Sequence, residues 1–379
     1  MHITVLDSRP MKFSRRKLLW AGATAAALGA GGYKLFRGFE DGAEKPQEIP
    51  LQLRGAGLDV HVHAMGVGTG NSGCWMSDAM KRSIQARAGL WTLRLSIDQP
   101  DLDQAYIGYL IRRIHTSGFL KQVVLLAQDY VYTEQGERAP FRTPFYTPND
   151  YVARLAREHT EFLFGASIHP YRRDALDELD RVAEQGAVLV KWIPNVQAIS
   201  LNDRRCRAFY RRLAQHKIAL LPHVGDEQAM VVAGQGYGDP RALAAPLEEG
   251  VTVIAAHVAS LGERDGRSNF DLLAEMFPKW PNLYGDTSAL TLITRWRKLL
   301  RLAERSDLHA RLVHGSDFPL PPASTVFFGR LPMSRWWNAW KRENPLRRDF
   351  EIKQGLGVPE ATYLRGYQVL APRIPAARS

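Results

Sequence analysis

The sequence is poor in cysteine and lacks a long uninterrupted hydrophobic run. Among 379 residues only Cys74 and Cys206 are cysteines, and they form no CxxC motif. Neither a disulfide framework nor a zinc knuckle is therefore indicated. A membrane-spanning helix needs about 20 apolar residues. The best candidate stretch, from Leu18 to Phe36, is slightly short of that length and is interrupted by Lys34.

The chain also lacks a strong excess of basic residues outside its first segment. The formal net charge is +11, but residues 1–37 hold seven basic residues against one acidic residue, which leaves +5 for the remainder. No recognisable nucleic-acid-binding module accompanies this mild excess of positive charge, so we expect no nucleic-acid partner. With 45% hydrophobic and 23% charged residues, the composition is that of a globular protein with an ample core.

Residues 1–37 carry the features of a targeting segment. The stretch SRRKLL at residues 14–19 resembles the twin-arginine export motif, and a mildly apolar stretch follows it to about Gly32. We expect a twin-arginine signal or anchor segment that engages the twin-arginine export machinery. The protein would then be periplasmic, or anchored in the inner membrane and facing the periplasm. No convincing cleavage site follows, so membrane anchoring by an uncleaved segment stays open, and an untargeted basic tail is the alternative.

The remaining sequence predicts a linker and one catalytic domain. Residues 38–54 are rich in charged residues, Gln, Pro and Gly, which is typical of a linker. Over residues 55–372, eight short apolar runs alternate with amphipathic stretches, which predicts βαβ units and a parallel sheet. The expected fold is α/β, a (β/α)8 TIM barrel, with Met76 to Leu95 mostly helical in the first long connection. The predicted strands are 58–63, 122–127, 162–169, 188–193, 218–223, 251–257, 282–287 and 311–317.

Two histidines stand at the end of the first predicted strand. His61 and His63 are separated by one residue, and side chains at positions i and i+2 of a strand point to the same side. This spacing is suited to holding a metal ion, although solvated or hydrogen-bonded histidines are the commoner finding for such a pair alone.

Similar side chains end four later runs. Lys191 ends the fourth run, His223 the fifth, His257 the sixth and Asp317 the eighth. In barrel enzymes the chemistry lies at the carboxyl ends of the strands. We therefore expect these residues to converge with the two histidines of the first run on one site.

Taken together, the strand ends resemble the amidohydrolase superfamily, in particular its amidohydrolase-related branch of metal-dependent barrel hydrolases. The resemblance extends over about residues 55–372. It rests on GLDVHVH at 57–63, LPHVGDE at 221–227, AAH at 255–257, NLYGDTS at 282–288, HGSDFP at 314–319 and the segment from VPE at 358–360 to Gly366.

The resemblance implies an enzyme that uses one or two divalent metal ions, zinc in the first place. The metal activates a water that attacks an amide, ester, lactone or related bond of a small-molecule substrate. Asp317 would be the catalytic acid–base group, and His257 would ligate a second metal or stabilise the developing oxyanion. The implied metal ligands are drawn from His61, His63, Lys191, His223, His257 and Asp317.

Lys191 leaves the number of metals open. If it were carboxylated, it would bridge two metals, as in the binuclear members of the superfamily. As a plain lysine it would pair with a carboxylate at the barrel mouth and oppose a second cation. Because the branch that this chain resembles is mostly mononuclear, we expect one metal.

A second function stays open, because the same branch includes non-oxidative decarboxylases of unsaturated or aromatic acids. Such an enzyme should present an arginine near the metal for the substrate carboxylate, and no arginine stands at a predicted strand end. The substrate itself cannot be read from the sequence, because specificity in barrels lies in the loops.

Several neighbouring residues have two interpretations each. Asp286 and His169 end strand-like runs and either line the pocket or cap loops. Asp226 and Glu227 either orient imidazoles or are solvated. The stretch from Phe327 to Phe350, with three tryptophans and several basic residues, would form a lid over the active site or a membrane-interface patch.

Overall fold

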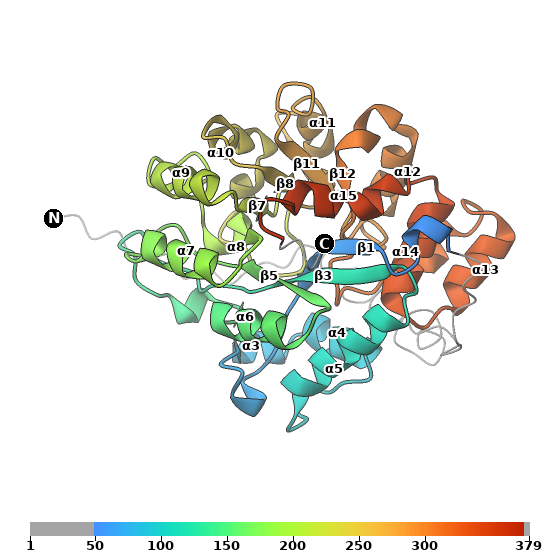
Figure 1. Cartoon of the computed structure of the whole chain (residues 1–379), viewed down its shortest axis with the longest axis horizontal. Helices are drawn as coiled ribbons and strands as arrows, with labels where there is room; N and C mark the ends of the chain where they lie inside the picture. Colours follow the sequence, from blue (N-terminus) through green and yellow to red (C-terminus); the bar gives the residue numbers. More distant parts are fainter. Residues whose placement is uncertain (1–48, 375–379) are drawn as a thin grey trace, which may run out of the picture.

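The structure is a computed structural model, and it describes residues 49–374. Eight strands form one sheet in the order β1-β3-β5-β6-β7-β8-β11-β12, and neighbouring strands pair in parallel (Figure 1). The eight predicted strands are confirmed. Their bounds are Gly57–His63 (β1), Leu120–Leu126 (β3), Phe162–Ala166 (β5), Leu189–Trp192 (β6), Ala219–Pro222 (β7), Val253–Ala255 (β8), Leu283–Asp286 (β11) and Leu312–Val313 (β12).

The sheet is nearly closed into a barrel where β1 meets the segment after β12. The backbone N–H of Val60 donates to the carbonyl of His314 at 2.9 Å, and that of His63 donates to Phe318 at 2.9 Å. Val62 and Phe318 form an isolated parallel bridge. Because β12 has only two residues, this seam consists of separate hydrogen bonds and not of a continuous ladder. The architecture is consistent with a TIM barrel.

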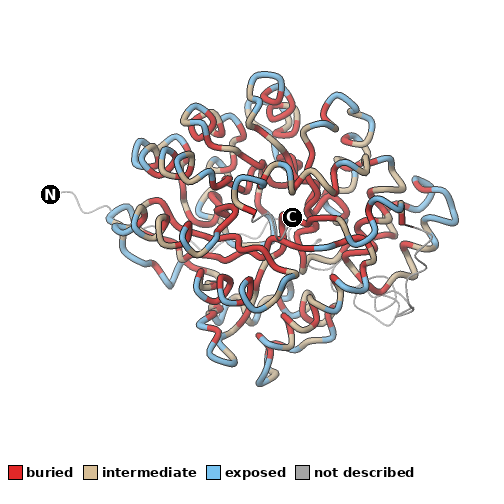
Figure 2. Tube along the Cα trace, in the orientation of Figure 1, coloured by how far each residue is buried: buried red, intermediate tan, exposed pale blue. Residues whose placement is uncertain are grey.

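Amphipathic helices cover the outside of the barrel. In α7 (Ala175–Glu184), Leu179, Val182 and Ala183 are buried while Asp177 is exposed, which is the i, i+3, i+4 pattern of a helix lying on a core. Figure 2 shows buried chain in the centre and exposed chain at the periphery. The longer helices besides α7 are α5 (Leu102–His115), α6 (Asn149–Glu158), α9 (Cys206–His216), α12 (Trp296–Glu304), α13 (Met333–Lys341), α14 (Pro345–Gly355) and α15 (Ala361–Leu370).

A separate apolar cluster joins the strands to the end of α15. Leu58 and Val60 of β1 belong to it, together with Leu370 and Ile374 from the C-terminal end of the described chain. Gly366 of α15 lies directly against β1, since a Cβ placed there would be 2.9 Å from Val60 Cγ1 and 3.0 Å from Leu58 Cδ2. The absence of a side chain therefore allows the last helix to approach the first strand closely.

The connection after β1 differs from the sequence-based expectation of one helix. Trp75 and Met76 form a strand, β2, that pairs antiparallel with β4 (Phe145–Tyr146). The helical part is divided into α3 (Asp78–Lys81) and α4 (Ile84–Thr92). The break occurs at Ser83, whose hydroxyl caps α4 by accepting from the N–H of Ala86, as N-cap serines do.

The predicted signal segment and most of the predicted linker lie outside the described residues. Within residues 49–54, Leu51–Leu53 form a 3₁₀ turn, and Ile49 and Leu53 are buried against the core. None of the helices between residues 49 and 374 combines the length and apolarity that crossing a membrane requires.

Candidate metal centre and active site

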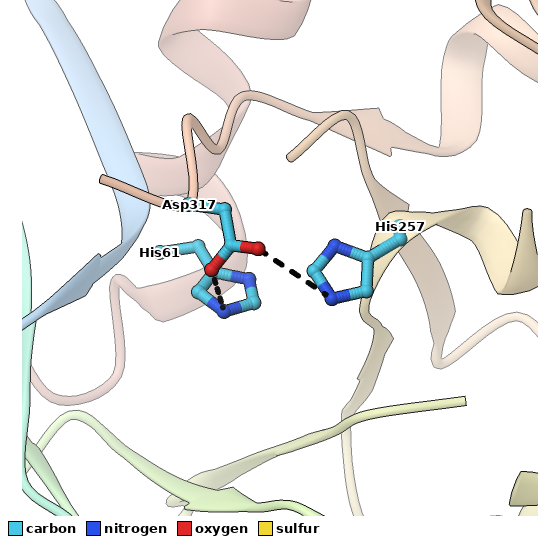
Figure 3. Close-up of side chains that lie close together, drawn as sticks. All are labelled: His61, His257 and Asp317. Carbon is cyan, nitrogen blue, oxygen red and sulfur yellow. Dashed lines mark ion pairs between the residues drawn. The ribbon is translucent and has the colours of Figure 1, made fainter. Parts of the chain in front are cut away.

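The six predicted ligands lie at or just beyond the carboxyl ends of their strands. His61 and His63 are on β1, and Lys191 is on β6. His223 directly follows β7, while His257 follows β8 and Asp317 follows β12. Ligand atoms of His61, His257 and Asp317 lie within 4.8 Å of one another, and all three residues are buried (Figure 3).

Asp317 is at the centre of this group. Its Oδ1 lies 3.3 Å from His61 Nε2 and 3.2 Å from His63 Nε2, and its Oδ2 lies 3.9 Å from His257 Nε2. The His223 ring is 5.0 Å from the His257 ring, measured between centroids. The structure thus brings four histidines and one carboxylate together from β1 and from the segments that follow β7, β8 and β12.

Asp286, at the end of β11, orients two of these histidines. Its Oδ2 accepts a hydrogen bond from His61 Nδ1 at 2.7 Å, and its Oδ1 accepts from the backbone N–H of His257 at 2.7 Å. The Ser288 hydroxyl lies 2.7 Å from His257 Nδ1. Because an ionised carboxylate only accepts, the His61 proton resides on Nδ1 and the lone pair on Nε2. Both interpretations of Asp286 apply, because it contacts the site and also caps the following loop by accepting from the backbone N–H of Ser288 at 3.0 Å.

The free donor atoms fit a metal ion. Among residues 49–374, the buried Nε2 atoms of His61 and His223 have no hydrogen-bond partner, although buried polar atoms are normally paired. The other nitrogen of His61 is fixed by Asp286, and His223 Nδ1 lies 3.5 Å from a carboxylate oxygen of Glu227. Metal-bound histidines typically present this arrangement, with one nitrogen for the ion and the other held by an acceptor.

The electrostatics favour the metal-ligating protonation state of three histidines and of Asp317. Burial lowers the pKa of His63 to about 4 and holds the pKa of His223 and of His257 well below the ordinary value. Burial alone would raise the pKa of Asp317, but the neighbouring imidazoles His61, His257 and His63 outweigh it and hold this pKa well below its usual range. Neutral imidazoles beside an ionised carboxylate are a donor set that zinc and similar divalent ions accept.

The backbone at two ligand positions is strained. His257, Val258 and Ala259 have φ values of 58°, 44° and 51°, and Asp317 has a φ of 66°. Left-handed backbone is unfavourable for residues with a side chain, above all for a β-branched one, and such strain clusters at functional sites. Both strained positions follow the ends of their strands, which are Ala255 for β8 and Val313 for β12.

Lys191 and Arg295 add positive charge to the site. Lys191 is 1% exposed, and burial lowers its pKa to about 8, although the charges of Asp317 and Asp286 act in the opposite direction. Arg295 is 6% exposed and donates to the Ser260 hydroxyl at 2.6 Å. Because the backbone N–H of Ser260 donates to the carbonyl of His257 at 2.9 Å, the guanidinium lies close to the cluster.

No arginine stands at the end of a predicted strand, as the sequence indicates, but Arg295 approaches the site from elsewhere. It follows the end of β11 by nine residues and is the N-cap of α12. No rule about strand ends points to such a position. Residues 287–294, which lie mostly in turns, connect Asp286 to Arg295.

Other residues considered from the sequence lie in different networks. His169 donates from Nε2 to the Gln197 carbonyl at 2.9 Å, and Asp226 pairs with Arg264 at 3.0 Å. Both therefore have structural partners. In α13, Trp336 donates to the Ser324 carbonyl at 3.0 Å and stacks on Trp340.

Comparison of the sequence and the fold with known proteins agrees with this geometry. The model of the family described as Amidohydrolase matches residues 59–327, which is more than half of the chain. This chain belongs to the amidohydrolase family. The family membership predicted from the sequence is confirmed, and enzymes of this family typically use a divalent metal ion.

Solved structures give the same fold at low identity. An uncharacterized TIM-barrel protein of Bordetella bronchiseptica has a TM-score of 0.56 at 16% identity, with 84% of this chain and 99% of that protein covered. A candidate 2-pyrone-4,6-dicarboxylic acid hydrolase of Pseudomonas putida has a TM-score of 0.51 at 13% identity, with 86% and 100% covered. Identities this low establish the fold alone. No curated protein matches this sequence.

Proposed function

We propose that this amidohydrolase-family enzyme is a metal-dependent hydrolase of an amide, ester, lactone or related bond in a small molecule. The observation that carries the proposal is the buried cluster of His61, His257 and Asp317, in which the Nε2 atom of His61 is held toward the cluster without a hydrogen-bond partner in the described chain. Zinc is the ion that this donor set favours, with His61, His63, His223 and Asp317 as the ligands of a single metal.

A divalent ion bound here would lower the pKa of a water to about 7 and so supply a nucleophile at neutral pH. Asp317 is ionised because its neighbours hold its pKa low, so it can accept a proton from that water and later deliver it to the leaving group. His257 Nδ1 donates toward the Ser288 carbonyl at 3.2 Å, so the neutral imidazole has its lone pair on Nε2, which faces Asp317 and can accept a proton or ligate a metal. Asp286 holds the imidazole of His61 and the backbone of His257.

The alternative is a non-oxidative decarboxylase of an unsaturated or aromatic acid. One observation favours it beyond the ligand set, namely the buried arginine Arg295 beside the cluster. A decarboxylase needs a cation near the metal to hold the substrate carboxylate, and Arg295 could serve. The same arginine is compatible with a hydrolase whose substrate carries an acid group.

One screen separates the two functions. Zinc-loaded protein is assayed against ester, amide, lactone and phosphoester panels, and the release of carbon dioxide from aromatic and unsaturated acids is followed in parallel. Turnover in the first set that is lost in His61→Ala supports the hydrolase. Carbon dioxide release without turnover in the first set would replace that proposal with the decarboxylase.

For location, we propose export by the twin-arginine machinery to the periplasm, with or without retention of the segment as an inner-membrane anchor. The proposal rests on SRRKLL at residues 14–19 and on the need of a metal enzyme to fold around its ion before transit.

A further inference from the structure

Helix α13 carries an apolar stripe that the fold leaves partly uncovered. Met333, Trp336, Trp337 and Trp340 recur at the i, i+3, i+4 and i+7 spacing of one helix face. Met333 is nevertheless 59% exposed and Trp337 is 47% exposed, and the buried residue of α13 is Ala339. A surface helix normally turns its apolar face toward the core, so α13 is unusual in presenting large apolar side chains outward.

The loop before α13 extends this surface. Phe328 is 59% exposed, and its ring lies edge to face with that of Trp336, with the centroids 4.9 Å apart. Trp336 in turn stacks on Trp340. Phe328, Met333 and Trp337 therefore form one exposed apolar surface, the α13 patch, supported by two partly buried indoles. Contiguous exposed patches of this kind mark interaction sites.

The charge around the α13 patch is positive. Arg330 and Arg335 are exposed, and no Asp or Glu occurs from residue 318 to residue 342. Within residues 49–374 neither arginine forms an ion pair, and Arg335 donates to the side-chain oxygen of Gln354 at 3.3 Å. Exposed aromatic side chains among basic residues are the combination that binds an anionic membrane interface, where Trp is also enriched.

The position of α13 favours a surface contact over a lid. Figure 1 shows α13 at the outer edge of the molecule, with α14 between it and the strands. The two helices pack closely, since a Cβ placed at Gly355 of α14 would be 2.7 Å from Leu331 Cδ2. Of the two interpretations of this stretch, the arrangement therefore supports the membrane-interface patch.

The described chain also begins on this side of the molecule. Its first element, the blue 3₁₀ turn Leu51–Leu53, lies at the same edge as α13 and α14 in Figure 1. The N–H of Gly55 donates to the Gly118 carbonyl at 3.1 Å, and Arg347 of α14 donates to the carbonyl of the preceding residue at 3.3 Å. Residues 38–48 can reach at most about 40 Å, so an anchor before residue 38 would hold the bilayer near the α13 patch.

We propose that the α13 patch binds the surface of an anionic lipid bilayer. Phe328, Met333 and Trp337 enter the interface, while Arg330 and Arg335 contact the lipid phosphates. The contact holds one flank of the barrel on the membrane. It does not depend on which reaction the metal centre performs.

A fluorescent label on the patch tests the contact in the full chain. Cys74 and Cys206 are buried, so a single cysteine introduced at the surface reacts selectively. Met333→Cys and the control Phe141→Cys, whose native side chain is 86% exposed on a separate loop, are labelled with an environment-sensitive fluorophore. Each is mixed with vesicles of phosphatidylglycerol and phosphatidylcholine, or of phosphatidylcholine alone. Because the label reports on its own surroundings, insertion of residues 1–37 does not by itself change the signal.

We expect the label on Met333→Cys to shift to the blue with anionic vesicles and to shift less with neutral vesicles. The label on Phe141→Cys should not shift. Replacing Arg330 and Arg335 together by Gln should reduce the shift to about half or less, because each basic residue near an anionic surface strengthens binding roughly fivefold. Trp337→Ser should act in the same direction, since it removes apolar area from the interface.

Three results would overturn the proposal. The absence of a shift in Met333→Cys, or an equal shift in Phe141→Cys, would reject the membrane contact. Equal shifts on neutral and anionic vesicles that persist without Arg330 and Arg335 would reject the anionic surface. A shift that grows with protein concentration in the absence of vesicles would assign the patch to a second copy of this chain. None of these results bears on the proposed hydrolase, which is tested by turnover.

Discussion

The Nδ1 of His61 donates to the carboxylate of Asp286 at 2.7 Å, although 225 residues separate the two along the chain. The same carboxylate holds the backbone of His257. One side chain therefore fixes two of the candidate ligands, and it comes from a strand that contributes no ligand itself.

Replacing Asp286 with Asn should weaken metal binding without preventing folding. An amide can present its NH₂ group to His61 and favour the wrong tautomer, and losing such a partner typically lowers metal affinity 10- to 100-fold. Competition against a chromogenic zinc chelator measures the change. Asp180→Asn is the matched control, because Asp180 pairs with Arg212 and His216 on the surface. Equal zinc affinity in both variants would contradict the positioning role.

Metal counting should give one ion per chain. Protein prepared with excess zinc and bicarbonate is analysed for bound metal. We expect one zinc that survives Lys191→Ala and is lost when His61 and His63 are both replaced by Ala. Two tightly held ions that fall to one or none in Lys191→Ala would instead establish a carboxylated, bridging Lys191.

The buried pair of Asp349 and Lys353 on α14 should be important for stability. The Lys353 ammonium also donates to the Gly315 carbonyl at 2.8 Å, two residues before Asp317. Asp349→Ala leaves that charge buried and should lower the free energy of unfolding by about 3–5 kcal/mol. Urea denaturation measures it, with the exposed helix residue Glu158 (Glu158→Ala) as a control expected to change by less than about 1 kcal/mol. If Asp349→Ala lowered the free energy of unfolding by less than about 1 kcal/mol, the Lys353 ammonium would be hydrated in the variant, and the pair would not be important for stability.

His169 should make the protein less stable in mild acid. Burial lowers the pKa of His169 to about 4 from an ordinary value of 6.5, so between these values the unfolded chain binds a proton that the folded chain excludes. Its contribution is fully present above pH 6.5 and declines as the pH falls to about 4, by about 3 kcal/mol in all.

His169→Gln should remove this part of the pH dependence. Unfolding free energies at pH 7.5 and 4.5 are compared between the variant and the wild type, which cancels the titration of other groups. His115→Gln, at an exposed position on α5, is the control. If the free energy of unfolding of His169→Gln fell between pH 7.5 and 4.5 by as much as that of the wild type, the assignment to His169 would be refuted.

Export should depend on the arginine pair near the N-terminus. Changing Arg15 and Arg16 together to Lys keeps the charge and should leave the protein in the cytoplasm. Fractionation with immunodetection measures the distribution. Undiminished recovery from the periplasm or membrane would reject twin-arginine export.

The barrel was predictable because its strands are apolar runs in the sequence. Most of the site was predictable because catalytic residues of barrel enzymes lie at the carboxyl ends of the strands. Three details were not. The predicted strand at 251–257 ends at Ala255, because His257 begins a left-handed turn. The partnership of Asp286 with His61 depends on tertiary proximity that no local pattern encodes. Arg295 reaches the site through a turn, so its distance from the strand end concealed it.

The seam between the first strand and the segment after the last strand has a consequence for folding. His61 and His63 lie on one side of it and Asp317 on the other, at the place where the sheet is held by separate hydrogen bonds. An ion bound by all three would link the two sides of this seam. Because these ligands come from both ends of the barrel sequence, the complete site would form only when the first strand and the segment after the last strand have met.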